Sequence, residues 1–133
     1  MAMALISSQR SKDPVTQVGA IIVNSENRIV GVGYNGMPNG INDDDIIWGK
    51  SSENFLLTKR PYVCHAEMNC ILNKLSADIR GCTMYVTLYP CNNCSKIIIQ
   101  SGIKQVIYYD DKNKKQVDAS ASMLMLEKAG VKL

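Results

Sequence analysis

The stretch Thr83–Tyr109 reads TMYVTLYPCNNCSKIIIQSGIKQVIYY, and its pattern decides the fold of this chain. Residues 83–88 carry the β-branched and aromatic side chains that favour a strand. Residues 92–101 predict a helix that ends at Gly102, the residue type that best tolerates a left-handed helix cap. Residues 105–109 predict a second strand. A strand, a helix of about ten residues and another strand imply a right-handed crossover between two parallel strands.

The segments on either side extend this arrangement. Residues 18–23 and 28–32 predict a hairpin, which the turn cluster Asn24–Asn27 connects. Three glycines and a proline within residues 33–40 predict a shaped loop, and residues 41–60 predict a long polar excursion with one helical turn. Further helices are expected at residues 65–75 and 119–129. The expected fold is α/β: a three-layer α/β/α sandwich around a mixed, largely parallel five-stranded sheet.

Composition limits the classes of function. Fifteen basic and twelve acidic residues give a net charge of +3, which is too small to indicate a nucleic-acid partner. No apolar run approaches the roughly 18 residues of a membrane span, so no membrane partner is expected. The five cysteines cannot all pair within the chain, and the first residues lack a secretory signal. We therefore expect reduced thiols and a cytoplasmic location, so that cysteine spacing indicates metal binding.

Two motifs carry the chemistry: Cys64-His-Ala-Glu-Met-Asn69 and Tyr89-Pro-Cys-Asn-Asn-Cys94. Zinc binds thiolate sulfur and imidazole nitrogen, and a catalytic site keeps one tetrahedral position for water. Cys91 and Cys94 are three residues apart at a helix start, so both thiolates lie on one face. His65 opens another helix and is the only histidine of the chain. We predict a zinc site made by His65, Cys91 and Cys94.

Glu67 is predicted to move protons beside this metal. It lies two residues after His65, and the intervening turn of about 200° points its carboxylate away from that imidazole. Zinc lowers the pKa of its bound water towards neutrality, and a carboxylate at Glu67 could take that proton and pass it on. The combination H-x-E with P-C-x-x-C is the signature of zinc deaminases.

A purely structural interpretation of the cysteines is also open. A lone C-x-x-C is as often a structural zinc knuckle or a redox pair as it is part of a catalytic zinc site. A structural zinc site needs four ligands, and Cys64 is the nearby fourth candidate, although its position next to His65 makes joint ligation awkward. Glu67 and Pro90 have no purpose in a knuckle, so a zinc-stabilised binding module without catalysis is the lesser alternative.

Over nearly its whole length the sequence resembles the cytidine deaminase superfamily, and most closely its deoxycytidylate deaminase branch. The matching segments are Ser8–Pro14, Gln17–Ala20, Gly31–Gly40, Pro61–Asn69, Pro90–Cys94 and Ile98–Ile103. The resemblance implies the cytidine deaminase-like fold and one deaminase domain over residues 1–133. It also implies that the chain is truncated at both ends, inside the family's first helix and before a C-terminal extension. Residues 37–60 contain no Cys or His for the second zinc of some relatives, so we expect one Zn²⁺ per chain.

The resemblance also implies roles for four substrate-binding residues. Asn35 matches an asparagine that contacts the deoxyribose, although Asn beside Gly is also a common turn pair. Arg10 falls where the family contacts phosphate, with a surface arginine as an even alternative. Tyr108 matches an aromatic residue that lies against the pyrimidine, but a half-buried strand tyrosine would look the same. Ala66 would offer backbone groups to the base edge.

The activity that the resemblance implies is hydrolysis of dCMP to dUMP and ammonia, which supplies thymidylate synthesis. The alternative is a zinc deaminase of cytidine, cytosine or a tRNA base. Related enzymes are homohexamers that dCTP with Mg²⁺ activates and dTTP inhibits. An effector site is expected in the glycine-rich loop, whose backbone N–H groups could bind phosphates. The aspartates that follow this loop could help to hold a cation, with a solvated acidic loop as an equal alternative. The candidate effector residues are Asn35, Gly36, Asn39, Gly40 and Asp43.

Overall fold

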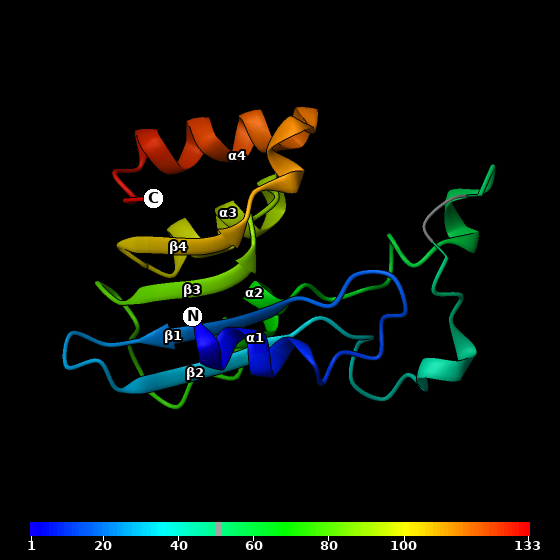
Figure 1. Cartoon of the computed structure of the whole chain (residues 1–133), viewed down its shortest axis with the longest axis horizontal. Coiled ribbons are helices and arrows are strands. Elements are labelled where there is room, and N and C mark those ends of the chain that lie inside the picture. Colours follow the sequence, from blue (N-terminus) through cyan, green and yellow to red (C-terminus); the bar gives the residue numbers. More distant parts are fainter. Residues whose placement is uncertain (50–51) are drawn as a thin grey trace.

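The computed structural model describes residues 1–49 and 52–133 (Figure 1). It contains four α-helices and four strands within these ranges. In chain order they are α1 (Ala2–Ser8), β1 (Gly19–Val23), β2 (Ile29–Tyr34), α2 (Ala66–Leu72), β3 (Thr83–Leu88), α3 (Asn92–Gln100), β4 (Gln105–Asp110) and α4 (Val117–Lys128). The predicted strand–helix–strand segment is confirmed, with boundaries that differ by at most one residue.

The described strands form one mixed sheet in the order β2-β1-β3-β4. β1 is antiparallel to both β2 and β3, and only β3 and β4 are parallel. The predicted five strands and largely parallel sheet are therefore wrong for this structure, because the hairpin joins β3 through an antiparallel pair. Beyond β4, a single parallel bridge joins Lys132 to Gln105, so pairing at a fifth position is limited to one residue.

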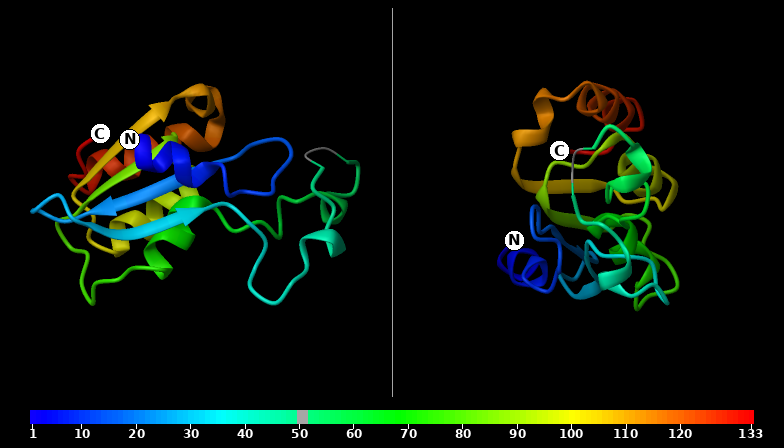
Figure 2. Two further views of the ribbon diagram at one scale, coloured as in Figure 1. Left: turned by 60° about the horizontal axis from the view of Figure 1, so that its bottom comes forward. Right: turned by 90° about the vertical axis from the view of Figure 1, so that its right-hand side faces the viewer.

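Helices cover both faces of the sheet, which confirms the three layers. α1 lies on one face, where it packs mainly on β1, while α2 and α3 lie on the other (Figure 2). α4 packs against α3. The core lies between the sheet and α2 to α4, and its fully buried side chains include Ile22, Met84, Val86, Ile98 and Leu126.

One glycine sets the distance between α2 and the sheet, and another ends α3. A Cβ on Gly33 would lie 2.3 Å from the backbone nitrogen of Cys70 and 2.5 Å from the carbonyl oxygen of Ala66, so only glycine lets α2 lie this close to β2. Gly102 has φ of +80°, which confirms the predicted left-handed end of α3. The first helical turn of α2 is thus held directly beside the end of β2.

The excursion after the glycine-rich loop projects from the sheet (Figure 1). Its described residues, 41–49 and 52–60, contain two short 3₁₀ turns, Asp43–Asp45 and Phe55–Leu57, where one helical turn was predicted. The helix predicted for residues 65–75 ends earlier, at Leu72, and Leu75 is largely exposed. Within residues 1–49 and 52–133, no helix has the length and apolar character needed to cross a bilayer.

Candidate active site and metal centre

His65, Cys91 and Cys94 come together at the start of two helices. The Nδ1 atom of His65 lies 3.5 Å from Sγ of Cys91 and 3.3 Å from Sγ of Cys94. One ligand atom from each residue lies within 4.8 Å of the others. His65 and Cys91 are 26 positions apart in sequence, and the chain between them forms α2 and β3, so the fold brings the site together.

Local helix geometry places each of these donors. His65 is the N-cap of α2, and Cys91 is the N-cap of α3. The Cys91 sulfur accepts a hydrogen bond from the backbone N–H of Cys94 at 3.5 Å. Unpaired N–H groups and the helix dipole make a helix start electropositive, which favours the thiolate form of a cysteine there.

The pKa values of the two thiols shift in opposite directions. The hydrogen bond between the Cys94 and Cys91 side chains lowers the pKa of Cys91 to about 4, and the side-chain contact with His65 acts in the same direction. The same Cys91–Cys94 bond, together with burial, raises the pKa of Cys94. The bond to Cys91 also raises the pKa of His65. One sulfur is therefore a thiolate at neutral pH, as a metal ligand must be.

These donors fit zinc in both chemistry and spacing. Tetrahedral zinc with Zn–S near 2.3 Å and Zn–N near 2.05 Å places nitrogen and sulfur about 3.5 Å apart. The separations of 3.3 and 3.5 Å between the imidazole nitrogen and the two sulfurs match that value. Three protein donors of this kind leave one tetrahedral position open, which is the composition of a catalytic zinc site.

Cys64 does not join this group. It pairs through its backbone with Gly36, on the side of the glycine-rich loop. Within the described part of the chain, the group of possible ligands at this site has only His65, Cys91 and Cys94. The geometry therefore offers no support for the four-ligand structural site that the sequence left open.

Glu67 is buried beside the cluster. Its side chain is 4% exposed, and it lies in the first turn of α2. Burial raises the pKa of the Glu67 carboxyl above its ordinary value, while the nearby His65 opposes the shift. A raised pKa makes the ionised carboxylate a stronger proton acceptor, as a general base requires.

Asn35 lies at the same edge of the sheet but is already hydrogen-bonded. Its Oδ1 accepts from the Val18 N–H at 2.8 Å, and its Nδ2 donates to the Thr16 carbonyl at 2.9 Å and to Asp13 Oδ2 at 3.2 Å. Asp13 in turn accepts a hydrogen bond from the buried Lys59. Asn35 is therefore part of a buried polar network, which the sequence did not indicate.

The other predicted substrate residues are spread around the site. Arg10 lies just beyond the end of α1, exposed, with its guanidinium carbon 5.6 Å from the centre of the Tyr34 ring. Ala66 is fully buried at the first position of α2, next to the cluster. Tyr108 is half-buried near the end of β4, and its ring meets that of Tyr89 edge-on at 5.0 Å between centroids.

Lys114, which belongs to none of the sequence motifs, lies over these rings. The ammonium of Lys114 lies 4.7 Å from the ring centre of Tyr108 and 5.2 Å from that of Tyr89. It also donates to the Tyr108 hydroxyl at 2.5 Å, a bond that raises the pKa of Lys114. A run of lysines beside aspartates gives no sequence signal for this contact, because β4 and the 3₁₀ turn Lys112–Lys115 create it.

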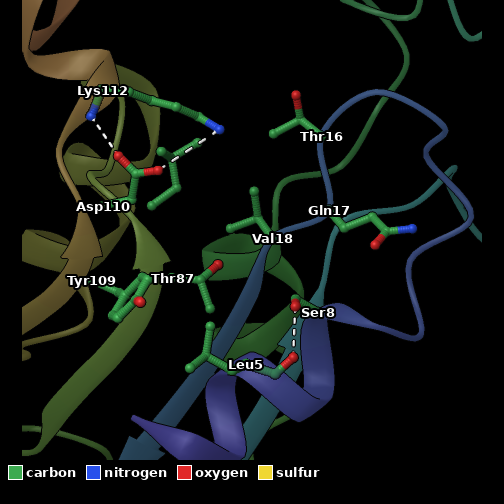
Figure 3. A pocket seen from close by; sticks show the side chains of 10 residues that line it. Leu5, Ser8, Thr16, Gln17, Val18, Thr87, Tyr109, Asp110 and Lys112 are labelled. Atoms are coloured by element: carbon green, nitrogen blue, oxygen red, sulfur yellow. Dashed lines mark hydrogen bonds and ion pairs between the residues drawn. The ribbon is translucent and has the colours of Figure 1, made fainter.

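Two cavities lie outside the metal cluster. One, of about 170 Å³, opens between α1 and the ends of β3 and β4, where Figure 3 shows Leu5, Ser8, Thr87 and Asp110 around it. The other, of about 340 Å³, lies between the glycine-rich loop and the outer side of α2. Its lining includes the predicted effector residues Gly36 and Asn39. The cluster of His65, Cys91 and Cys94 lines neither cavity.

The remaining candidate effector residues lie outside the second cavity. Asn35 is engaged in the buried network, and Gly40 has φ of +86° in the loop. The carboxylate of Asp43 pairs with Lys12 at 2.9 Å. The structure thus brings only two of the five predicted effector residues to a cavity wall.

A three-layer α/β/α fold with a His-Cys-Cys metal site at two helix starts, beside a buried glutamate, defines the class of zinc-dependent nucleobase deaminases. Residues 1–110 match the family model described as the cytidine and deoxycytidylate deaminase zinc-binding region. The chain belongs to this family.

Individual relatives agree with this assignment. The deoxycytidylate deaminase of Homo sapiens is 60% identical over 131 residues, an alignment that covers 98% of this chain and 74% of the human protein. The probable deoxycytidylate deaminase of Drosophila melanogaster is 51% identical, covering 98% of this chain and 67% of the relative. The dCMP deaminase of cyanophage S-TIM5, solved in complex with dCMP and dUMP, is similar in structure. It gives a TM-score of 0.72 at 29% identity, over 98% of this chain and 89% of that one.

Proposed function

We propose that this chain hydrolyses dCMP to dUMP and ammonia, and so supplies dUMP for thymidylate synthesis. The observation that carries the proposal is the His65–Cys91–Cys94 cluster with the buried Glu67 beside it. The identity of 60% to the human deoxycytidylate deaminase supports dCMP as the substrate, as does the structural likeness to a dCMP deaminase with dCMP and dUMP bound.

His65, Cys91 and Cys94 would hold one Zn²⁺ per chain. When bound, zinc acts as a Lewis acid that makes hydroxide available near neutral pH. Glu67 accepts a proton from the attacking water and delivers it to N3 of the cytosine ring. Oxygen adds at C4, the C4–N4 bond breaks, and Glu67 helps to protonate the departing amine. Water and dCMP thus become dUMP and ammonia without any further reactant.

The surrounding residues would orient the nucleotide. Asn35 would contact the deoxyribose, and its three hydrogen bonds to the chain fix its position for that contact. The exposed guanidinium of Arg10 would bind the 5′-phosphate. Tyr108 would lie against the pyrimidine, and the backbone of Ala66 would bind the base edge.

Regulation by dCTP with Mg²⁺ and by dTTP belongs to the same proposal. The cavity of about 340 Å³ that includes Gly36 and Asn39 supports a nucleotide site apart from the metal cluster. The protomer is small, so coupling between the sites would pass through subunit interfaces of a homohexamer. A cytoplasmic location agrees with five cysteines that are all free thiols.

The deciding experiment measures ammonia release from dCMP, dCTP, deoxycytidine, cytidine and tRNA by the purified, zinc-loaded chain. We expect turnover of dCMP with much weaker use of the two nucleosides. A preference for cytidine, or activity only on a tRNA base, would instead identify a deaminase of another substrate. No release from any of them would favour a binding module.

The metal content tests the site itself. Metal analysis of the purified protein should give one zinc per chain, because three protein donors and one open position make a single catalytic site. Removing the metal with a chelator should abolish ammonia release, and added Zn²⁺ should restore it. Two zincs per chain, or Cys64 as a fourth ligand, would contradict the prediction.

A further inference from the structure

Two buried serine hydroxyls connect α4 to the loop that carries Cys91. Ser95 of α3 and Ser122 of α4 have no exposed surface, and their Oγ atoms lie 2.6 Å apart. Ser122 donates to the carbonyl oxygen of Pro90 at 2.8 Å. Buried serine hydroxyls normally have hydrogen-bond partners. Here the two hydroxyls and the Pro90 carbonyl form one short chain of hydrogen bonds.

The Pro90 carbonyl needs this donor. Pro90 is fully buried, and it lies after the end of β3 and before the N-cap of α3, so neither element provides a hydrogen bond for it. No backbone N–H in the described residues donates to Pro90 outside the regular elements. A buried carbonyl without a partner is costly, so Ser122 satisfies a group that the local backbone leaves unpaired.

The direction of the bonds follows from counting protons. The carbonyl of Cys91 already accepts the helical N–H of Ser95 at 2.9 Å. The Ser95 hydroxyl also lies 2.9 Å from that carbonyl, and 2.6 Å from the Ser122 hydroxyl. Donation from Ser95 to Ser122 is the arrangement that places a proton in the short contact between the serines and leaves the Ser122 proton for Pro90. Each proton is used once, and hydrogen bonds arranged head to tail strengthen one another.

This chain of bonds acts on the position of the Cys91 sulfur. The Pro90 carbonyl shares its peptide plane with the nitrogen of Cys91, so rotation of that plane turns Cys91 and displaces its Sγ. The residue before it, Tyr89, is fixed separately by its N–H bond to the Asp110 carbonyl at 2.9 Å. Two tethers, one to β4 and one to α4, thus hold the two residues that precede the proposed ligand.

We propose that Ser95 and Ser122 are positioning residues that fix Cys91 for metal binding through the Pro90 carbonyl. The proposal rests on the proposed zinc site and adds two residues that do not touch the metal. Groups that orient metal ligands from outside the coordination sphere typically change metal affinity or activity by about 10- to 100-fold when removed.

The test measures metal binding as well as turnover. Ser122→Ala in the full chain should lose zinc to an excess of chelator about 10-fold faster than the unchanged protein. With Co²⁺ in place of zinc, its absorption bands should shift because the Cys91 sulfur moves. Ser95→Ala should have a smaller effect, since Ser122 keeps its bond to Pro90, and the double variant should be no worse than Ser122→Ala.

Ser7→Ala is the matched control. Ser7 is also buried on a helix and donates to a backbone carbonyl, that of Gly33, at 2.9 Å. It should lose stability but keep the zinc release rate and the cobalt spectrum. Ser122→Thr retains the hydroxyl and should restore slow zinc release.

Unchanged zinc release and an unchanged cobalt spectrum in Ser122→Ala would overturn the proposal, even if its melting temperature falls like that of Ser7→Ala. If Ser122→Ala does not fold, the same two measurements on Ser95→Ala decide. An unchanged protein that binds no zinc would refute the proposed function instead, so the two failures are distinguishable.

Discussion

Glu67 shows at the scale of one residue how burial prepares a side chain for chemistry. Its carboxyl lies in the first turn of α2, where burial raises its pKa, and it stands outside the group of metal donors. Burying a carboxylate away from water costs folding free energy. A role as proton shuttle accounts for a buried carboxyl at this position.

Glu67→Ala should therefore keep zinc and the fold but lose deamination. We expect a fall in kcat of about 10²- to 10⁴-fold, the usual value of general acid–base catalysis. Ammonia release and metal analysis on the same preparation measure both effects. The exposed Glu53→Ala serves as the control and should match the unchanged protein. Near-normal turnover by the metal-replete Glu67 variant would refute the shuttle.

Asn35 combines a structural and a proposed binding role. Its amide accepts one hydrogen bond and donates two, and the Val18 N–H would be left unpaired without it. Asn35→Ala should lower the free energy of unfolding by about 2 kcal/mol, because buried groups lose their partners. Urea unfolding measures this loss, and Asn39→Ala on the exposed loop is the control. A variant as stable as the unchanged protein would contradict the network.

At the scale of elements, the chemistry depends on two helix starts. α2 and α3 each begin at a proposed ligand, and the close approach at Gly33 sets α2 beside β2. The sheet edge formed by the ends of β2, β3 and β4 and the start of β1 brings the remaining site residues near these helices. Ligands bind at such edges in open α/β sheets.

Arg10 follows α1 at this edge, with an exposed guanidinium over the Tyr34 ring. Arg10→Ala should raise KM for dCMP far more than for deoxycytidine, because only dCMP carries the phosphate that a guanidinium binds. Steady-state kinetics with both substrates measure the difference. Arg28→Ala, in the exposed pair with Glu26, is the control. Equal losses on both substrates would make Arg10 structural.

At the scale of the whole molecule, the two candidate nucleotide sites lie apart. The cavity beside Gly36 and Asn39 lies against α2, the helix whose N-cap is His65 of the proposed metal site. Regulation requires that an effector bind two global states with different affinity, and the subunit interfaces of the proposed homohexamer are where those states would differ.

We therefore expect a sigmoidal dependence of rate on dCMP that becomes hyperbolic with dCTP and Mg²⁺. The dTTP nucleotide should restore the sigmoidal curve. Initial rates over a range of dCMP, with and without each triphosphate, measure this, and Asn39→Ala should weaken the effect of dCTP. Hyperbolic kinetics of the intact oligomer that neither triphosphate changes would contradict the regulation.

The sequence by itself determined the local elements and the donor set. The strand–helix–strand segment from residue 83 and the glycine end of α3 were confirmed, because they depend on side-chain type and helix capping within a few residues. The proposed zinc donors followed from ligand chemistry and from a single histidine, and the structure brings these three side chains together. The predicted number and direction of the strands were wrong, since pairing partners are not encoded by local pattern.

Only the tertiary structure decided which distant groups meet. In the Lys59–Asp13–Asn35 network the bonded residues are 46 and 22 positions apart in sequence, and in the Ser95–Ser122 bridge they are 27 apart. Neither the network nor the serine bridge is marked by a sequence motif, because a serine or lysine has the same local propensity whether its partner is a carbonyl or water. Hydrogen bonds between such groups become decisive only when packing excludes water from them, and packing is a property of the whole chain.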